Sequence, residues 1–307
     1  RTRGTGPRFI FRLVIPAFVN DAAGTASAAK RALEDVGGFE IHATAPDRLE
    51  SEIRAAMASK PARIVIAGGD GSVGTAARVI CGTETELAVL PGGTLNHFAR
   101  DHEIPTDFAQ AAETALNGKC AKSDIAYVGD RLFLNTSSVG AYVTYVRLRD
   151  RIEKHFGYRI ASLIAAVRLF MVMRPVELEL EVEGERRRYS TQMVFIGVGE
   201  RETRSPILGN RVRGGKSCLH IIVVRERRAA RLLVVALDAA TRGLSQLAHT
   251  PELDSFLVDA CTIKLHRRHH VAVDGEILDG TPTLAYRLEK DSLRIVVPAA
   301  TDGAGET

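Results

Sequence analysis

Apolar and polar residues follow two different patterns along this chain, and the first pattern extends to about residue 124. There, short apolar runs alternate with amphipathic segments, which predict strands at 9–15, 63–67 and 87–90 and helices at 22–36, 49–59 and 73–81. The run at 63–67 (Arg-Ile-Val-Ile-Ala) is almost wholly apolar, as expected of a strand buried on both faces of a parallel sheet. Strands and helices in this alternating order predict a doubly wound α/β domain.

In the second pattern, apolar and polar residues alternate with period two. Residues 176–182 (Val-Glu-Leu-Glu-Leu-Glu-Val) are the clearest case, and Gly184 separates them from a similar run at 189–196, as in a β-hairpin. We expect further strands at 219–224, 262–266, 269–273 and 293–297, and helices at 142–154, 158–173 and 229–247. This part of the chain therefore predicts a second domain of mainly antiparallel β structure.

Composition and charge narrow the classes of protein that fit. The 307 residues are 45% hydrophobic and 25% charged, proportions that exclude a disordered or collagen-like chain. The net charge of only +4 and the lack of Trp argue against binding of nucleic acid. No stretch reaches the ~18 apolar residues of a membrane span, and four scattered cysteines suit a reducing compartment. We expect a cytoplasmic protein, and the oligomeric state stays open, a homodimer included.

The first candidate for chemistry is Gly68-Gly69-Asp70-Gly71-Ser72, directly after the 63–67 strand and at the start of a helix. Glycines let a backbone turn sharply and bring its N–H groups close to a ligand, and a helix N-terminus adds donors and a positive dipole end. The segment is thus a candidate phosphate-binding loop. An ordinary strand–helix turn favours the same residue types, so this segment alone leaves both interpretations open.

A second segment, 91–101 (Pro-Gly-Gly-Thr-Leu-Asn-His-Phe-Ala-Arg-Asp), repeats the order of strand, glycine turn and helix. Thr94 and Asn96 are short hydrogen-bonding residues where a helix cap or a phosphate ligand belongs, and Gly93 precedes them. Because neighbouring parallel strands end at one edge of a sheet, we expect both glycine turns at the carboxyl edge, where open α/β sheets bind ligands.

Val273-Asp274-Gly275-Glu276, at the end of an apolar strand, is the third candidate. An acidic pair of this kind can orient a hydroxyl nucleophile and accept its proton, although the same pattern is common in hairpin turns. Two weaker motifs are discarded. Gly197-Val198-Gly199 begins like a dinucleotide-binding fingerprint but lacks the third glycine, and 210–217 ends like a Walker A loop but has Asn210 where that motif requires Gly.

In this order, the three segments resemble the catalytic domain of the diacylglycerol kinase family, which includes bacterial lipid kinases and sphingosine and ceramide kinases. Gly-Gly-Asp-Gly alone also occurs in NAD kinases and phosphofructokinases, whereas the run 93–100 is specific to the lipid-kinase group. Asp124 ahead of 133–140 (Phe-Leu-Asn-Thr-Ser-Ser-Val-Gly) and the stretch 156–168 match too. The resemblance covers nearly the whole chain and is strongest to a bacterial branch with Asn-His-Phe-Ala-Arg-Asp.

The resemblance implies an α/β ATP-binding domain at 1–124 and a β-sandwich lipid-substrate domain at 125–287. Residues 288–307 are a candidate to return to the first domain. ATP would bind in the cleft between the two domains. It implies an ATP-dependent lipid kinase of phospholipid biosynthesis that uses Mg²⁺ and visits the inner membrane face to reach its lipid substrate. The nucleotide phosphates would be held by Gly68, Gly69, Asp70, Gly71, Ser72, Gly93, Thr94 and Asn96. Asp274 would take the proton of a hydroxyl on a diacylglycerol-like lipid, Glu276 would help to set up the site, and Arg100 and Asp124 would support the charge network.

The chain departs from the family pattern at several positions. The family's Asn-Pro-x-Ser-Gly phosphate loop is here 15–19 (Ile-Pro-Ala-Phe-Val), with Asn20 or Gly24 as partial replacements, and His97 replaces an acidic residue. An Asp-rich loop that holds a structural magnesium in some relatives is here 214–218, so we expect no structural metal there. Two alternatives therefore stay open: a kinase of a soluble acceptor, similar to NAD kinase, and a lipid- or nucleotide-binding module without catalysis.

Basic residues offer a further expectation about the membrane. Arginines at 147, 149 and 151, at 186–188, and at 225, 227, 228 and 231 are candidates to face anionic headgroups, although surface arginines are usually only solvated.

Overall fold

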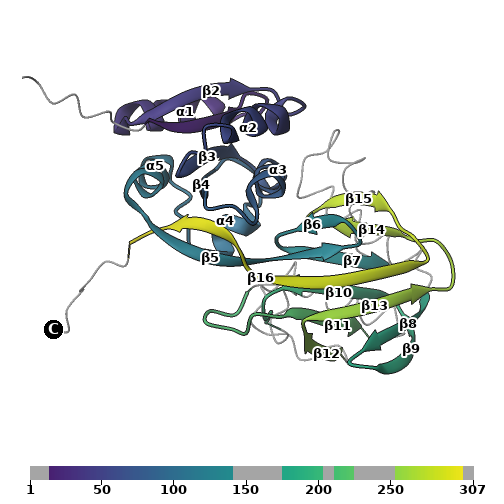
Figure 1. The fold of residues 1–307 in the computed structure, drawn as a ribbon. Helices are drawn as coiled ribbons and strands as arrows, with labels where there is room; N and C mark the ends of the chain where they lie inside the picture. The colour runs from purple at the N-terminus through teal and green to yellow at the C-terminus, as the bar shows by residue number, and fades with distance from the viewer. Residues whose placement is uncertain (1–13, 141–174, 203–210, 225–252, 300–307) are drawn as a thin grey trace, which may run out of the picture. The chain divides into compact units, whose positions relative to one another are not determined.

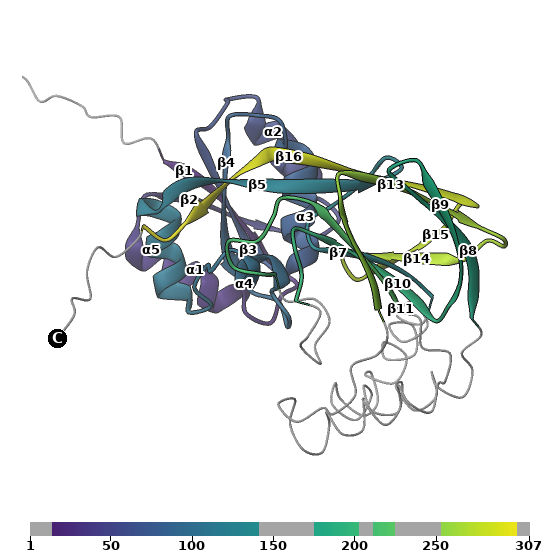
Figure 2. The same ribbon diagram turned by 90° about the horizontal axis from the view of Figure 1, so that it is seen from below.

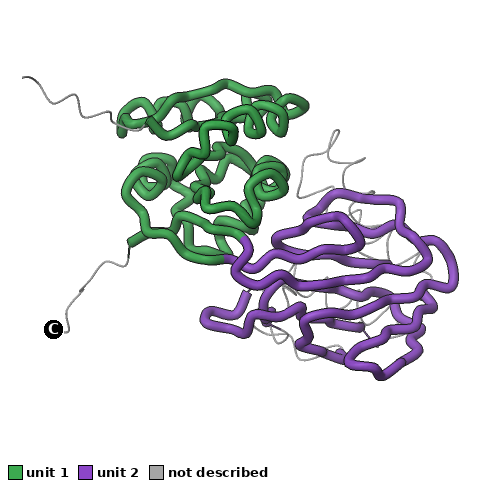
Figure 3. Tube along the Cα trace, viewed as in Figure 1, with its two compact units in different colours: residues 1–122, 293–307 green, residues 123–292 purple. Residues whose placement is uncertain are grey.

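The computed structural model describes residues 14–140, 175–202, 211–224 and 253–299 (Figure 1). The chain divides into two compact units, residues 1–122 with 293–307 and residues 123–292 (Figure 3). Two strands, β5 (Lys119–Val128) and β16 (Thr283–Val297), pair with each other (Figure 2), and each contributes residues to both units. The helices predicted at 142–154, 158–173 and 229–247 lie outside the described residues.

The first unit has the predicted α/β architecture. Its parallel strands lie in the order β2 (Phe39–Thr44), β1 (Ile15–Asn20), β3 (Arg63–Gly68), β4 (Glu86–Pro91), followed by the end of β16. Its helices are α1 (Ala26–Val36), α2 (Leu49–Met57), α3 (Asp70–Ile80), α4 (His97–Asp101) and α5 (Phe108–Asn117). Helices α1 and α5 pack with one set of alternating strand residues, while α2 and α3 pack on each other and contact β1 and β3, respectively.

The second unit is a β-sandwich, as predicted. One sheet contains β8 (Val176–Val182), β9 (Glu185–Thr191), β13 (Ala260–Leu265), β16, β5 and β6 (Arg131–Phe133). The other has the antiparallel order β12 (Leu253–Val258), β11 (Leu219–Val224), β10 (Met193–Val198), β7 (Thr136–Gly140), β14 (His270–Val273), β15 (Glu276–Asp279). Alternate apolar residues of both sheets share one core, for example Leu180 and Ile263 of the first and Ile196 and Ile221 of the second.

Residues 9–13 of the first predicted strand, 9–15, lie outside the described residues. Strand β1 is formed by residues 15–20, so the prediction ended it too early. The strand continues although Pro16 has no N–H for a sheet. Pro16 is tolerated because it lies at the amino end of β1. On one side it pairs with Glu40 of β2. On the other side, pairing with β3 starts one residue later, between Ala17 and Val65. Helix α3 also begins at Asp70, three residues before the predicted start, so the first turn of α3 takes in the end of the glycine segment.

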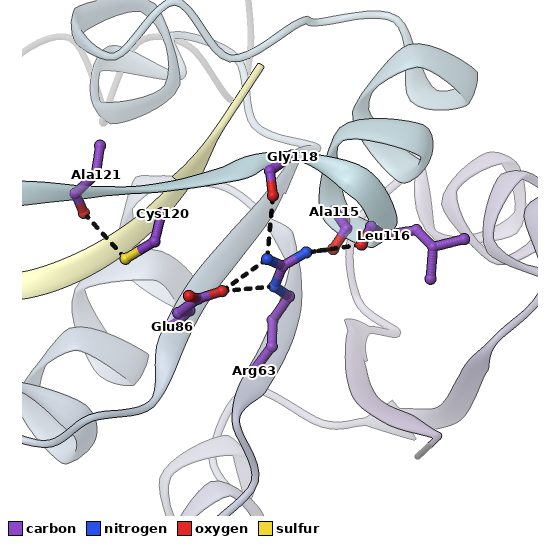
Figure 4. Close-up of polar contacts among 7 residues, drawn as sticks. All are labelled: Arg63, Glu86, Ala115, Leu116, Gly118, Cys120 and Ala121. Atoms are coloured by element: carbon purple, nitrogen blue, oxygen red, sulfur yellow. Dashed lines mark hydrogen bonds and ion pairs between the residues drawn. The ribbon is translucent and has the colours of Figure 1, made fainter. Parts of the chain in front are cut away.

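The Arg63 side chain links the amino ends of β3 and β4 to the end of α5 (Figure 4). The Arg63 guanidinium, 14% exposed, donates from Nε and Nη2 to Glu86 Oε2 at 2.9 and 2.7 Å. It also donates to the carbonyls of Ala115 (2.7 Å), Leu116 (2.9 Å) and Gly118 (3.2 Å) at the end of α5. A cation is favourable at a helix C-terminus, where carbonyls lack partners. This edge is therefore held by structural contacts, and the glycine turns lie at the opposite one.

Candidate functional site

At the carboxyl edge of β3 and β4, the two glycine turns lie side by side. The Gly92 N–H donates to the Gly68 carbonyl at 2.9 Å, which continues the strand pairing into the turns. A Cβ added to Gly93 would lie 2.7 Å from the Gly69 Cα, closer than real Cβ atoms come. The backbones of the two turns are thus in direct contact, and Gly93 is required because a side chain there has no room.

Asp70 connects the two turns through its side chain. It stands in the first turn of α3, and its carboxylate accepts the N–H groups of His97 at 3.1 Å and Phe98 at 3.0 Å. These are the first N–H groups of α4, which have no partner within that helix. Asp70 therefore caps α4, and the N-terminus of this five-residue helix is already satisfied by protein.

Asn96 and Thr94 have different places in the second turn. The Asn96 side chain accepts the Gly93 N–H at 2.8 Å and donates to the Gly93 carbonyl at 2.9 Å, while its own backbone is left-handed (φ 49°). Its amide is therefore engaged in closing the turn. The Thr94 side chain is exposed at the tip of the same turn.

A third segment, which follows β1, joins the glycine turns. Asn20 donates from Nδ2 to Ser72 Oγ at 3.2 Å and accepts the Ala22 N–H at 3.1 Å, and Thr25 Oγ1 donates to the Gly92 carbonyl at 2.9 Å. Residues 15–19 belong to strand β1, which ends at Asn20, and residues 21–25 connect it to α1. The role of Asn20 and Gly24 as partial replacements for the family's first phosphate loop stays a prediction. Thr25 was missed by the sequence analysis because its partner lies 67 residues away.

The backbone N–H groups at the start of α3 can donate hydrogen bonds to phosphate oxygens. The N–H groups of Ser72 and Val73 bond to the Gly69 carbonyl, whereas those of Asp70 and Gly71 precede the first intrahelical bond. Gly71 is exposed, and a Cβ added to it would meet nothing within 4 Å, so the space beside this backbone is open. An anion is favoured there by the helix dipole. Within the residues that the structure describes, three or more His, Cys, Asp or Glu side chains nowhere gather as a metal site.

In the second unit, Asp274 lies in the tight turn of the β14–β15 hairpin. Asp274 (φ 45°) and Gly275 (φ 85°) are both left-handed, as a two-residue type I′ turn requires. The Asp274 carboxylate leaves the hairpin and accepts three backbone N–H groups between β6 and β7. Oδ2 accepts from Leu134 at 2.7 Å, and Oδ1 accepts from Asn135 and Thr136, each at 2.9 Å. These three hydrogen bonds fix the orientation of the carboxylate.

The other predicted site residues of the two units have separate partners. Exposed Glu276 pairs with Arg131 and ties β15 to β6. Asp124 is buried on β5, and its carboxylate accepts the Asp291 N–H at 3.0 Å, where β16 has a left-handed residue. Arg100 is exposed on α4. The charge network of Arg100 and Asp124 stays a prediction.

Two buried polar residues beside Asp274 were missed by the sequence analysis. Asn135 donates its N–H to Asp274, and Arg201 donates to the Asn135 carbonyl at 3.1 Å. The signal available in the sequence was Gly197, discarded above as part of a nucleotide motif. A Cβ on Gly197 would lie 2.6 Å from Arg201 Cγ, so this glycine makes room for the arginine.

The first part of the chain is similar to a known family. Residues 15–128 match the family model of the diacylglycerol kinase catalytic domain. The matched region includes both glycine turns and Asp70, together with Asp124.

Curated relatives of the diacylglycerol kinase family match over part of their length. A diacylglycerol kinase of Staphylococcus aureus is 28% identical over 171 residues, 52% of this chain and 53% of that protein. A diacylglycerol kinase of Staphylococcus carnosus is 27% identical over 154 residues, 48% of this chain and 50% of that protein. The chain thus spans about half the length of these relatives. A solved structure of a diacylglycerol kinase from Bacillus anthracis shares the fold, with a TM-score of 0.67 at 18% identity over 94% of this chain and 98% of that one.

The described residues contain no helix long and apolar enough to cross a membrane. The three arginines of β9 are exposed, and each lies near a carboxylate: Arg186 near Glu181 (3.1 Å), Arg187 near Glu185 (2.8 Å) and Arg188 near Glu179 (3.5 Å). These pairs largely cancel the positive charge of β9. The other arginines proposed to face headgroups lie outside the described residues.

Proposed function

We propose that this protein is an ATP-dependent lipid kinase that phosphorylates a hydroxyl of a diacylglycerol-like lipid. The observation that carries the proposal is the Asp274 carboxylate, which three backbone N–H groups hold in one orientation directly after β14. A carboxylate held in a fixed orientation suits a general base. The family of the first domain supports phosphoryl transfer, and the names of the relatives support diacylglycerol as the acceptor class.

The phosphates of ATP fit the start of α3. Backbone N–H groups of Asp70 and Gly71 bind them, and Gly71 allows close approach because no side chain stands in the way. Mg²⁺, bound together with ATP, neutralises charge on the phosphates. Asn20, Ser72, Asn96 and Gly93 act indirectly, since their hydrogen bonds and close contacts fix the turns around α3.

In the transfer step, the lipid hydroxyl oxygen forms a bond to the γ-phosphorus of ATP while the bond from that phosphorus to the β–γ bridging oxygen breaks. The hydroxyl proton passes to Asp274, and the products are a phosphorylated lipid and ADP. Glu276 keeps Arg131 beside the hairpin and so helps to hold Asp274 in place. Phosphoryl transfer depends mainly on alignment and charge neutralisation, so these parts are sufficient.

The test is transfer of label from γ-labelled ATP to a panel of lipids in mixed micelles, followed by organic extraction. We expect label in the lipid phase with diacylglycerol or a related alcohol, and loss of that label in Asp274→Asn. Asp279→Asn is the matched control, because Asp279 is an exposed aspartate of the same hairpin. Its transfer rate should equal that of the parent.

Two outcomes would overturn this function. Label in a water-soluble product, with NAD as acceptor, would indicate a kinase of a soluble substrate. Binding of ATP without transfer to any acceptor would indicate a binding module. Full activity of Asp274→Asn would leave lipid phosphorylation in place and remove Asp274 from it.

Contact with a membrane surface is part of the proposal, because the acceptor is a lipid. Flotation with anionic and neutral vesicles at low and high salt tests it: binding to anionic vesicles should fall at high salt. Equal binding to both kinds of vesicle at every salt concentration would contradict an electrostatic contact.

A further inference from the structure

The Arg201 side chain is a buried cation in the second unit, although arginine is rarely buried without a reason. Arg201 is only 3% exposed. Its Nη2 donates to the carbonyls of Val198 at 2.7 Å and Asn135 at 3.1 Å, and its backbone N–H donates to His220 Nδ1 at 2.8 Å. A buried guanidinium is costly to remove from water. Its position beside Asn135 therefore calls for an explanation.

The fold makes room for this side chain. Gly197 stands on β10 opposite Thr136 of β7, and a Cβ on Gly197 would lie 2.6 Å from Arg201 Cγ and 2.8 Å from Arg201 Nε. Any other residue at 197 would displace the arginine. His220 holds the backbone at Arg201. Burial lowers the pKa of His220 and favours the neutral ring, whose Nδ1 accepts the backbone N–H of Arg201.

One peptide group links Arg201 to Asp274. The Asn135 carbonyl and the Thr136 N–H belong to the same peptide, whose oxygen accepts from Arg201 and whose N–H donates to Asp274 Oδ1 at 2.9 Å. A cation at the oxygen and an anion at the N–H polarise the peptide in the same direction, so each hydrogen bond strengthens the other. The Asn135 oxygen also accepts the Val198 N–H at 3.0 Å, which holds the peptide against β10.

We propose that Arg201 is a positioning residue for Asp274 and acts through the peptide between Asn135 and Thr136. This inference rests on the proposed function, in which Asp274 accepts a proton. Arg201 fixes the segment that donates the N–H groups, and this segment fixes the orientation of the Asp274 carboxylate. Loss of Arg201 should therefore slow the chemical step and leave substrate binding intact.

The main test is Arg201→Met, which keeps the length of the side chain and removes its charge and donors. We expect kcat to fall about 10- to 100-fold, the effect of a small misplacement of a catalytic group, with KM for ATP and lipid changed by less than about twofold. Arg201→Lys, which retains a cation and a donor, should recover part of kcat. In the Asp274→Asn background, Arg201→Met should cause little further loss, because the two residues act as a unit.

Two further variants separate positioning from general stability. Gly197→Ala keeps Arg201 but displaces it, so kcat should fall in the same direction. Ile263→Ala, in the core on β13 of the other sheet, destabilises the same unit and should leave kcat unchanged at a temperature where the protein is folded. Hydrogen exchange at the amides of Leu134, Asn135 and Thr136 should accelerate in Arg201→Met and not in Ile263→Ala.

The outcomes distinguish the two proposals. If the parent transfers no label, the proposed function fails, and the role of Arg201 in catalysis fails with it. If the parent is active and Asp274→Asn is not, an Arg201→Met variant with parental kcat overturns the inference alone. A rise in KM without a fall in kcat, or unchanged exchange at the three amides, also overturns it.

Discussion

Asp70 lies in the first unit and Asp274 in the second. They make the same kind of hydrogen bond, but its consequence differs between the two. Both carboxylates accept backbone N–H groups from a distant part of the chain, two from α4 for Asp70 and three from residues 134–136 for Asp274. The donors of Asp70 are helix-start N–H groups that need a partner in any case. The donors of Asp274 belong to a connection between strands, and Asp274 itself has a left-handed backbone.

The difference between the two shows how a motif aspartate can serve structure or reactivity. Both oxygens of Asp70 are engaged with α4, so its carboxylate joins two turns and fixes the backbone around the start of α3. In Asp274 three such bonds fix the carboxylate of a left-handed hairpin residue, the group that acts as base in the proposed function. Four measurements test this distinction, in order of expected effect.

The largest effect is expected for Asp274→Asn. The rate of lipid phosphorylation should fall by about 10²- to 10⁴-fold, the usual contribution of a general base. The amide retains one oxygen for the N–H donors, so the protein should still fold and bind ATP. The rate of label transfer and the KM for ATP check this. A KM for ATP that rises as much as kcat falls would place Asp274 in nucleotide binding instead.

Gly93→Ala should be the most destabilising change among the turns. The new methyl group would lie 2.7 Å from the Gly69 backbone, which has no flexible side chain to move away. We expect a loss of about 1–3 kcal/mol in the free energy of unfolding, as in other overpacked sites, measured by urea denaturation. Gly71→Ala is the matched control, since its methyl group meets open space. It should keep or raise stability while weakening ATP binding, and unimpaired ATP binding would contradict a phosphate at that position.

Asp70→Ala should have a moderate effect on stability. Removal of a helix-capping carboxylate costs about 0.5–2 kcal/mol, and Asp70→Asn should cost less because the amide oxygen still accepts one N–H. Urea denaturation of the two variants checks the order. If Asp70 only joins the turns, the KM for ATP should rise in both variants in proportion to the stability lost. A fall of kcat as large as in Asp274→Asn would show that the comparison between the two aspartates is wrong.

The smallest effect concerns pH and His220, which supports Arg201. Burial lowers the pKa of His220 from its ordinary value of 6.5, so the folded protein binds fewer protons than the unfolded chain below about pH 6.5. Stability should therefore be fully present above pH 6.5 and decrease as the pH falls toward the lower folded pKa. Denaturation midpoints of the parent and His220→Gln between pH 7.5 and 5.5 measure this. A pH slope as steep in the variant as in the parent would assign it to another group, for instance His269, whose pKa burial also lowers.

Local patterns in the sequence predict the fold well where burial alternates with a short period. Strand β8 has the predicted bounds, 176–182, because every second residue is apolar and buried. Strand β3 follows from its apolar run, and the contact between the glycine turns follows from the parallel order of β3 and β4. The prediction ended strand β1 too early, at Ile15. Whether a strand tolerates a proline such as Pro16 depends on which neighbour its N–H side faces, and that is a property of the assembled sheet.

The contacts of the candidate site could not be predicted from the sequence for a related reason. Asp70 reaches α4 27 and 28 residues later, and Asp274 reaches Asn135 139 residues earlier. Neither distance leaves a periodic trace in the sequence. The acidic pair after an apolar strand made Asp274 a candidate, and the resemblance to a family gave it the role of base. The N–H groups around it and the arginine behind them are visible only in the folded chain.

The return of β16 to the first unit has a consequence for folding during synthesis. Residues 293–297 include buried Leu293, Ile295 and Val296, and Ile295 pairs with Leu87 of β4. A ribosome makes β4 some two hundred residues before this partner emerges, so a nascent chain exposes the edge of β4 throughout that interval. The first unit can complete its sheet only after the second unit has been translated. Premature termination in the second unit would then release an α/β domain with an open, apolar edge, a species prone to aggregation.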